Sequence, residues 1–252
     1  MEIFVAPDAS GTGAVAAGIL AAVIRSKPTT VLGVATGSSP IPVYAALAEH
    51  QLDMSPVRAF ALDEYVGLLA GHRQSYAEVI RREVTERLGL DPALVSVPNG
   101  QARAPHRAAA EYDAAIRDAG GIDLQILGIG HNGHIAFNEP GSALDSRTRV
   151  EVLTERTRRA NARYFSSQED VPQRCITQGL GTILEAGQLL MVVTGEDKAQ
   201  VLSAALHGPV SVQCPASVLQ LHPHVTVVAD EAAALHLGAA QGHVPVRTLA
   251  ST

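Results

Sequence analysis

The sequence has no tryptophan, two cysteines, three methionines and only two lysines beside 17 arginines. Cys175 and Cys214 stand apart and form no CxxC pair, so we expect neither a disulfide framework nor a cysteine-based metal site. The longest apolar run, 14–24, is shorter than the ~20 residues that cross a bilayer, and no basic segment of a signal peptide precedes it. These absences predict a cytoplasmic protein with reduced thiols that is neither exported nor embedded in a membrane.

The charge balance excludes a nucleic-acid-binding class. The net charge is −6 and the pI is about 5.9, and no long segment carries a strong basic stripe. A mild exception is 145–163, which holds six arginines against three acids. With 46% hydrophobic residues in 252, and no repeat, low-complexity block or Ser/Gly-rich linker, the chain is expected to form one domain over 1–252.

Short β-branched runs alternate with longer helical patterns along the chain. Such alternation predicts an α/β fold with a doubly wound, mostly parallel sheet and helices on both faces, as in Rossmann-like proteins. The expected strands are 2–5, 30–35, 57–62, 95–97, 123–128, 149–153, 189–194 and 225–229, and the expected helices are 10–25, 40–50, 75–88, 105–119 and 198–206.

The segment 140–173 has the weakest pattern of secondary structure and is rich in arginine. Two interpretations stay open. It could be a mobile lid that closes over bound substrate, or an ordinary solvated helix with arginines on its outer face. Composition alone favours the solvated helix.

The turn after the second expected strand, ATGSSP at 35–40, leads into a helix with proline near its first turn. Thr36, Ser38, Ser39 and the free N–H groups of the turn would face an anion at the positive end of that helix, and a phosphate-bearing ligand suits such a turn. The alternative is that Ser38 or Ser39 only caps the helix. No Gly-Lys-Ser/Thr follows, so the turn is not a Walker loop.

Two acids, Asp63 and Glu64, close the third expected strand. Burial at that position would raise the pKa of a carboxyl group toward the working range of a general base, so one of them is a candidate base. A pair of solvated loop acids is the alternative.

The stretch 123–142, DLQILGIGHNGHIAFNEPGS, places glycines, histidines, asparagines and a glutamate directly after a strand, where open α/β sheets carry their chemistry. His134, close to Asn132 and five residues before Glu139, suits an acid/base held in place by a carboxylate. His131 is interpreted as an ordinary polar loop residue. The stretch is therefore predicted to be an active-site loop.

The loop has two other interpretations. Residues 128–133 match GxGxxG, but Pro140 and Gly141 arrive too soon for the helix that a dinucleotide site requires. His131, His134 and Glu139 could bind a metal, yet no cysteine or aspartate cluster completes the ligand set, so no metal is expected. Lys198, after the strand 189–194, is a candidate phosphate contact or else a surface lysine.

Taken together, these motifs resemble the glucosamine-6-phosphate deaminase family. The matches follow the family's order across almost the whole chain, although the loop 36–40 is shared more broadly with 6-phosphogluconolactonase-like proteins. They are GVATGSSP at 33–40, LDEYVGL at 62–68, LGIGHNGHIAFNEPGS at 127–142, SRTR at 146–149, ANARYF at 160–165 and PASVLQLH at 215–222.

The resemblance implies an enzyme that converts glucosamine 6-phosphate to fructose 6-phosphate and ammonia without metal or cofactor. It implies that Asp63 removes the C2 proton, and that His134, assisted by Asn132 and Glu139, opens the sugar ring. It also implies which residues bind the phosphate group, namely Thr36, Gly37, Ser38, Arg163 and Lys198. Competing functions are a lactonase of the same fold and a non-catalytic sugar-phosphate sensor. The preference between glucosamine and galactosamine 6-phosphate stays open.

The chain departs from regulated members of that family. Many of them carry aspartate where Asn132 stands here. Their allosteric site matches Ser142 and Arg149, but Glu151 and Val152 replace its lysine and threonine. We therefore expect no activation by N-acetylglucosamine 6-phosphate, because Glu151 would repel its phosphate. The short segment after 246 lacks the longer C-terminus of hexameric members, which favours a monomer.

Overall fold

A parallel sheet forms the centre of the computed structural model, which describes residues 1–237 and 246–248. Within these residues the sheet has the order β11-β1-β10-β9-β6-β2-β3-β5, and every neighbouring pair is parallel. Its strands are β1 (Glu2–Ala6), β2 (Val31–Val34), β3 (Arg58–Ala61), β5 (Val95–Ser96), β6 (Leu124–Leu127), β9 (Gln188–Val193), β10 (Val225–Asp230) and β11 (Val246–Thr248). The expectation of a monomer was based on the short segment after 246, and residues 249–252 of that segment lie outside the described residues.

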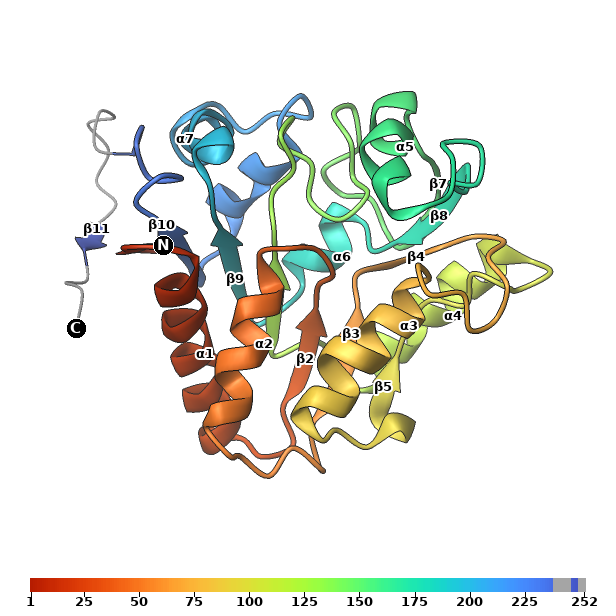
Figure 1. Ribbon diagram of the computed structural model, residues 1–252, viewed down its shortest axis with the longest axis horizontal. Coiled ribbons are helices and arrows are strands. Elements are labelled where there is room, and N and C mark those ends of the chain that lie inside the picture. The colour runs from red at the N-terminus through yellow and green to blue at the C-terminus, as the bar shows by residue number, and fades with distance from the viewer. Residues whose placement is uncertain (238–245, 249–252) are drawn as a thin grey trace.

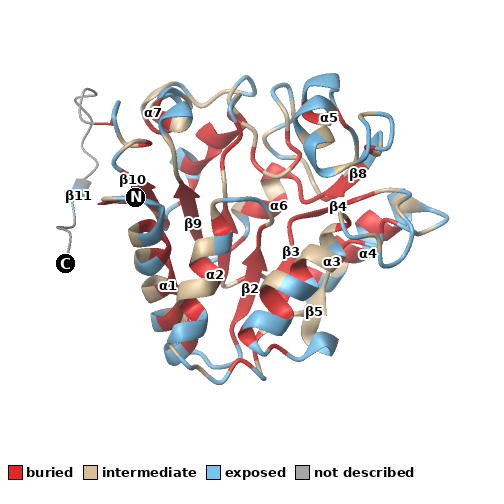
Figure 2. Ribbon diagram, viewed as in Figure 1, coloured by how far each residue is buried: buried red, intermediate tan, exposed pale blue. Residues whose placement is uncertain are grey.

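Helices cover both faces of this sheet, as the alternating pattern predicted. In Figure 1, α1, α2 and α3 lie in front of the strands, and α4 and α6 lie behind them. Figure 2 shows buried strands between helices whose outer faces are exposed. Apolar strands of four to six residues suit this arrangement because a parallel sheet is covered on both sides. The helices are α1 (Ala9–Ser26), α2 (Pro40–Glu49), α3 (Tyr76–Ile80), α4 (Pro105–Asp118), α6 (Leu180–Leu184) and α7 (Ala199–His207).

Helix α1 is the one helix in the described part of the chain that is long and apolar enough to cross a membrane by length and composition. It contacts α2, β1, β9 and β10, and residues such as Ala16, Ala17 and Leu20 are fully buried in the main core. Such burial is what a core helix of a folded domain shows.

A second, antiparallel sheet of order β4-β8-β7 lies beside the first. Its strands are β4 (Asp63–Tyr65), β7 (Arg149–Val152) and β8 (Arg174–Thr177). The strand expected at 149–153 exists, but its place among parallel strands was wrong, because it pairs antiparallel with β8. The chain leaves the large sheet after β3 and enters the small one at Asp63, with only Leu62 between.

The segment 140–173 is more regular than expected. It contains β7, the helix α5 (Glu155–Asn161) and a short 3-10 helix, η3 (Ala162–Tyr164). Thr154 caps α5 by accepting a hydrogen bond from the Thr157 amide at 3.1 Å. The other short elements are a π-helix η1 (Arg81–Glu86), which continues α3 within the helix expected at 75–88, and the 3-10 helices η2 (Pro92–Leu94), η4 (Glu196–Lys198) and η5 (Pro215–Leu221).

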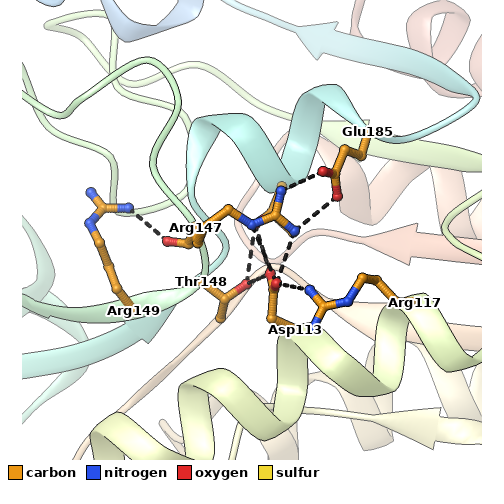
Figure 3. A network of polar contacts seen from close by, with 7 residues as sticks. Asp113, Arg117, Arg147, Thr148, Arg149 and Glu185 are labelled. Carbon is orange, nitrogen blue, oxygen red and sulfur yellow. Dashed lines mark hydrogen bonds and ion pairs between the residues drawn. The ribbon is translucent and has the colours of Figure 1, made fainter.

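Asp113 of α4 ties the chain before β7 to the core (Figure 3). Its carboxylate accepts hydrogen bonds from Arg147 at 2.9 Å, Thr148 at 2.9 Å and Thr182 at 2.8 Å, and from Arg117. Burial raises the pKa of Asp113, but hydrogen bonds from Arg147, Thr182 and Thr148 outweigh burial and lower it to about 2.

Replacing Asp113 with asparagine is expected to reduce the free energy of unfolding at pH 7 by about 2–3 kcal/mol, because charge-assisted bonds to a buried carboxylate are lost. The native pKa lies below the usual 3.8, so this stabilisation is present above about pH 4 and disappears as the pH falls toward 2. Urea unfolding at several pH values measures both effects.

The matched control is Glu111→Gln on the same helix, where an exposed ion pair with Arg107 contributes little. Equal unfolding midpoints for the Asp113 and Glu111 variants at pH 7 would contradict the assigned role of Asp113.

Candidate active site

The loops that follow four neighbouring strands meet at one edge of the parallel sheet. Strands β9, β6, β2 and β3 are adjacent in that order, so their carboxyl ends lie side by side. The Oγ atoms of Ser39, after β2, and Thr194, after β9, are 3.3 Å apart. Helix α5 lies on the same side of the molecule as the arrowheads of β2 and β9 (Figure 1). The predicted site residues come from these loops and from the segment 140–173.

Asp63 and Glu64 differ in the hydrogen bonds that their carboxyl groups receive. This difference indicates which of the two is the candidate base, a choice that the sequence left open. Both are buried. Glu64 accepts hydrogen bonds from the amides of Tyr65, Tyr76 and Ala77 at 2.7–2.9 Å and so fixes the start of α3. Among the described residues none donates a hydrogen bond to the Asp63 carboxyl group. Burial, and secondly the charge of Glu64, raise the pKa of Asp63 to about 8. Asp63 is therefore the candidate base, and Glu64 is structural.

Strand β8 holds Asp63 next to the histidine loop. Asp63 pairs with Thr177, whose hydroxyl group accepts a hydrogen bond from the Phe137 amide at 3.2 Å. One residue along, the Asn138 amide group donates to the Gln178 carbonyl at 2.8 Å. Asp63 and the loop that carries His134 thus share one strand as support and lie on the same side of the molecule.

His134, Asn132 and Glu139 form a hydrogen-bonded relay. The Asn132 Nδ2 donates to Glu139 Oε2 at 2.7 Å, which turns the Asn132 Oδ1 toward His134 Nδ1, also at 2.7 Å. An amide oxygen only accepts, so Nδ1 carries the proton and Nε2 of the neutral ring has a free lone pair. Burial lowers the pKa of His134 although the charge of Glu139 raises it. The ring is therefore set up as a base at Nε2.

Gly130 leaves room for the ring of His134. A side chain at Gly130 would place its Cβ 2.0 Å from His134 Cε1, so only glycine lets the imidazole lie against this backbone. Gly133 has a φ of +85°. The Gly130 amide bonds back to the His134 carbonyl at 2.9 Å and no helix follows before Pro140. The loop lacks the helix of a dinucleotide site, so that alternative is not supported.

His131 is an exposed polar residue of the loop, as the sequence interpretation has it, and it has two charged neighbours. Its Nε2 lies 2.6 Å from Asp197 Oδ2, and Lys198 Nζ donates to its Nδ1 at 3.1 Å. The sequence could not reveal these contacts because the partners lie 66 and 67 residues away. His131 and His134 thus face different partners, and no group of three potential metal ligands is found within 1–237 and 246–248.

The predicted phosphate-binding residues come from three loops. Gly37 has a φ of +110°, Ser38 is exposed, and Ser39 at the start of α2 makes no side-chain capping bond, so the capping alternative is not found. Lys198 is half-buried. Burial lowers the pKa of its ammonium group, Asp197 raises it, and the nearby charge of Arg163 lowers it further. The charge of Arg163, in η3, is thus near enough to Lys198 to affect its pKa.

The fold and this arrangement define an open α/β protein with a candidate acid/base site at the carboxyl edge of its parallel sheet. Residues 9–228 match the model of the glucosamine-6-phosphate isomerases/6-phosphogluconolactonase family. The chain belongs to this family.

Relatives and solved structures agree with this assignment. The chain is 54% identical to a glucosamine-6-phosphate deaminase of Arthrobacter sp. (strain FB24), covering 94% of this chain and 93% of the relative. It is 55% identical to a glucosamine-6-phosphate deaminase of Rhodococcus opacus (strain B4), with the same coverage. A solved monomeric glucosamine-6-phosphate deaminase superposes with a TM-score of 0.90 at 37% identity, covering 93% of this chain and 99% of that one. A 6-phosphogluconolactonase from Trypanosoma cruzi shares the fold, with a TM-score of 0.73 at 21% identity over 94% of this chain and 96% of that one.

Proposed function

We propose that this protein is a glucosamine-6-phosphate deaminase, which converts glucosamine 6-phosphate and water to fructose 6-phosphate and ammonia. The observation that carries the proposal is the buried Asp63 carboxyl group, which receives no hydrogen bond from the described residues and adjoins a loop whose His134 is oriented as a base. The identities of 54% and 55% to deaminases support it. A lactonase would not need a carbon base at Asp63, and a sensor would need none of the proton-transfer groups.

His134 opens the sugar ring, and Asp63 removes the C2 hydrogen. His134 Nε2 takes the proton of the C1 hydroxyl group, the bond between C1 and the ring oxygen breaks, and His134 passes the proton to that oxygen, which leaves an aldehyde at C1. Asp63 then removes the C2 hydrogen, the electron pair moves into the C1 carbonyl group, and the C1 oxygen takes up a proton, which gives an enolamine. Protonation at C1 produces an imine at C2. Water adds to the imine carbon and ammonia leaves, which gives fructose 6-phosphate.

The phosphate group would hold the open sugar in place between these residues. We assign it to Thr36, Gly37 and Ser38 at the start of α2, with Lys198 and Arg163 supplying positive charge. Arg163 comes from the segment 140–173, so a lid that closes on the substrate would complete the phosphate site.

An ammonia assay tests the function directly. Purified protein in buffer with a chelator and no added cofactor should release one ammonia per glucosamine 6-phosphate consumed. Hydrolysis of 6-phosphogluconolactone without ammonia release would favour the lactonase. Binding of the amino sugar without turnover would favour the sensor.

N-acetylglucosamine 6-phosphate is expected to leave the kinetics unchanged, because the cation that would bind its phosphate is already occupied. Arg149 Nε lies 2.6 Å from Glu151 Oε1, Nη1 donates to Asn138 Oδ1 at 2.9 Å, and Nη2 donates to Ser142 Oγ at 3.2 Å. Initial rates with and without the acetylated sugar measure this. A sigmoidal substrate curve that becomes hyperbolic with that ligand would refute the expectation.

We further propose that the enzyme is a cytoplasmic monomer with a single domain over 1–252. The likeness to a monomeric deaminase at 37% identity supports the monomer. Light scattering distinguishes a particle of 26.3 kDa from an oligomer.

A further inference from the structure

Helix α5 brings one hydroxyl group, that of Thr157, to the histidine relay, and the hydroxyl group of its N-cap residue Thr154 contacts Thr157. Thr154 Oγ1 donates to Thr157 Oγ1 at 3.1 Å, and Thr157 Oγ1 donates in turn to Glu139 Oε1. Thr157 is 8% exposed and the Glu139 side chain 15%, so water competes little for this bond. The family motifs that identified the site left Thr157 without a role.

These contacts extend the relay into one chain of hydrogen bonds. Each donor is fixed by its neighbour, because a carboxylate can only accept. Thr157 and Asn132 donate to the two oxygens of Glu139, and the Asn132 oxygen accepts from His134 Nδ1 at 2.7 Å. The Glu139 Oε2 atom itself lies 3.8 Å from His134 Nδ1, too far for a hydrogen bond. Glu139 therefore acts on the imidazole through Asn132, and its orientation decides which way the Asn132 amide faces.

We propose that Thr157 is a positioning residue for ring opening. Its hydroxyl group holds Glu139 in the orientation that makes Asn132 present its oxygen to His134, which keeps the proton on Nδ1 and the lone pair on Nε2. The inference rests on the proposed deaminase function. It also links the segment 140–173 to the chemistry, because His134 is held as a base only while α5 is docked.

The other end of α5 is anchored on the side of the carbon base. Asn161 Nδ2 donates to the Tyr65 hydroxyl group at 2.8 Å, and the ring of Phe165 packs edge-on against Tyr65 with centroids 5.8 Å apart. Tyr65 lies in β4, two residues after Asp63. One helix thus contacts the supports of both proposed catalytic groups, but only Thr157 reaches the relay of His134. Loss of its hydroxyl group should therefore affect ring opening more than C2 proton removal.

The test compares two substrates. One is glucosamine 6-phosphate, which must be opened, and the other is an analogue without the 4- and 5-hydroxyl groups, which cannot close a five- or six-membered ring. Thr157→Val removes the donor at nearly constant volume. We expect kcat/KM to fall about 10- to 100-fold on the closed sugar, as for loss of a hydrogen bond to a charged group, and less than about 3-fold on the open analogue. Thr157→Ser, which keeps the hydroxyl group, should restore the closed-sugar rate to within about 3-fold.

The matched control on the same helix is Arg159→Ala. Its side chain is 71% exposed and forms an exposed ion pair with Glu155 at 3.6 Å, so both rates should stay near those of the unmodified protein. Equal losses on both substrates for Thr157→Val, or failure of Thr157→Ser to restore the rate, would overturn the proposal. Absence of ammonia release by the unmodified protein would instead refute the deaminase function.

Discussion

Asp63→Asn is expected to lower ammonia release from glucosamine 6-phosphate by roughly 10²- to 10⁴-fold, the usual contribution of a general base. Exchange of solvent hydrogen into the sugar should be lost with it, because no other described acid is both buried and free of hydrogen-bond donors at this strand end. Binding of an open-chain amino-alditol 6-phosphate should remain largely intact. NMR in D2O and calorimetry measure the two properties, and retained exchange would remove Asp63 from this role.

The pH dependence of the reaction follows from the raised pKa of Asp63. The free protein is active only with Asp63 ionised, so kcat/KM should rise as the pH increases toward about 8. The cationic amino group of a bound amino sugar favours the carboxylate, so kcat should reach its plateau at lower pH. A profile of kcat/KM that is flat between pH 6 and 9 would contradict this assignment.

Thermal stability shows whether Asp63→Asn loses activity because the base is missing or because the protein unfolds. The pKa of Asp63 in the folded protein is about 8 against a usual 3.8, so the folded state holds the proton more tightly and stability falls as the pH rises between about 4 and 8. Asp63→Asn removes this effect and should melt no lower than the unmodified protein at pH 8. Glu64→Gln is the matched control, and it should lower the melting temperature because Glu64 receives three backbone amides.

His134→Gln is expected to slow turnover of glucosamine 6-phosphate by roughly 10²- to 10⁴-fold, because glutamine can keep a hydrogen bond but cannot take the hydroxyl proton. The open-chain analogue bypasses that step and should lose far less. Initial rates on the two substrates give the ratio. Equal losses on both would count against a role of His134 in ring opening.

Periodicity was sufficient for the strands of the large sheet other than β11, which was not predicted. The expected strand 123–128 is β6, and the expected helix 105–119 is α4 with one residue fewer, because both are long or apolar enough for local pattern to decide. The small sheet was missed. Its strand β4 has three residues, two of them acidic, and it exists because β8 pairs with it from more than 100 residues away. Such pairing is set by the assembled fold and leaves no local period.

The candidate site shows the same division. From the sequence alone there was no reason to choose between Asp63 and Glu64 as the base. The structure shows that the amides at the start of α3 donate hydrogen bonds to Glu64 and not to Asp63. The contacts of His131 were equally invisible in the sequence, since Asp197 and Lys198 come from the loop after a distant strand. Thr157 carried no local signal, because a hydroxyl group on an arginine-rich helix is unremarkable until Glu139 lies beside it. The catalytic and phosphate-binding assignments themselves stay predictions.

The most direct test uses glucosamine 6-phosphate labelled with deuterium at C2, in ordinary water with a chelator and no cofactor. If Asp63 removes the C2 hydrogen from the opened sugar, one ammonia should appear for each fructose 6-phosphate, deuterium should be lost to solvent or found at C1, and the rate should be lower than with unlabelled substrate when proton removal limits it. Ammonia release with the deuterium still at C2 would show that nitrogen leaves without carbon deprotonation. That result would contradict the account.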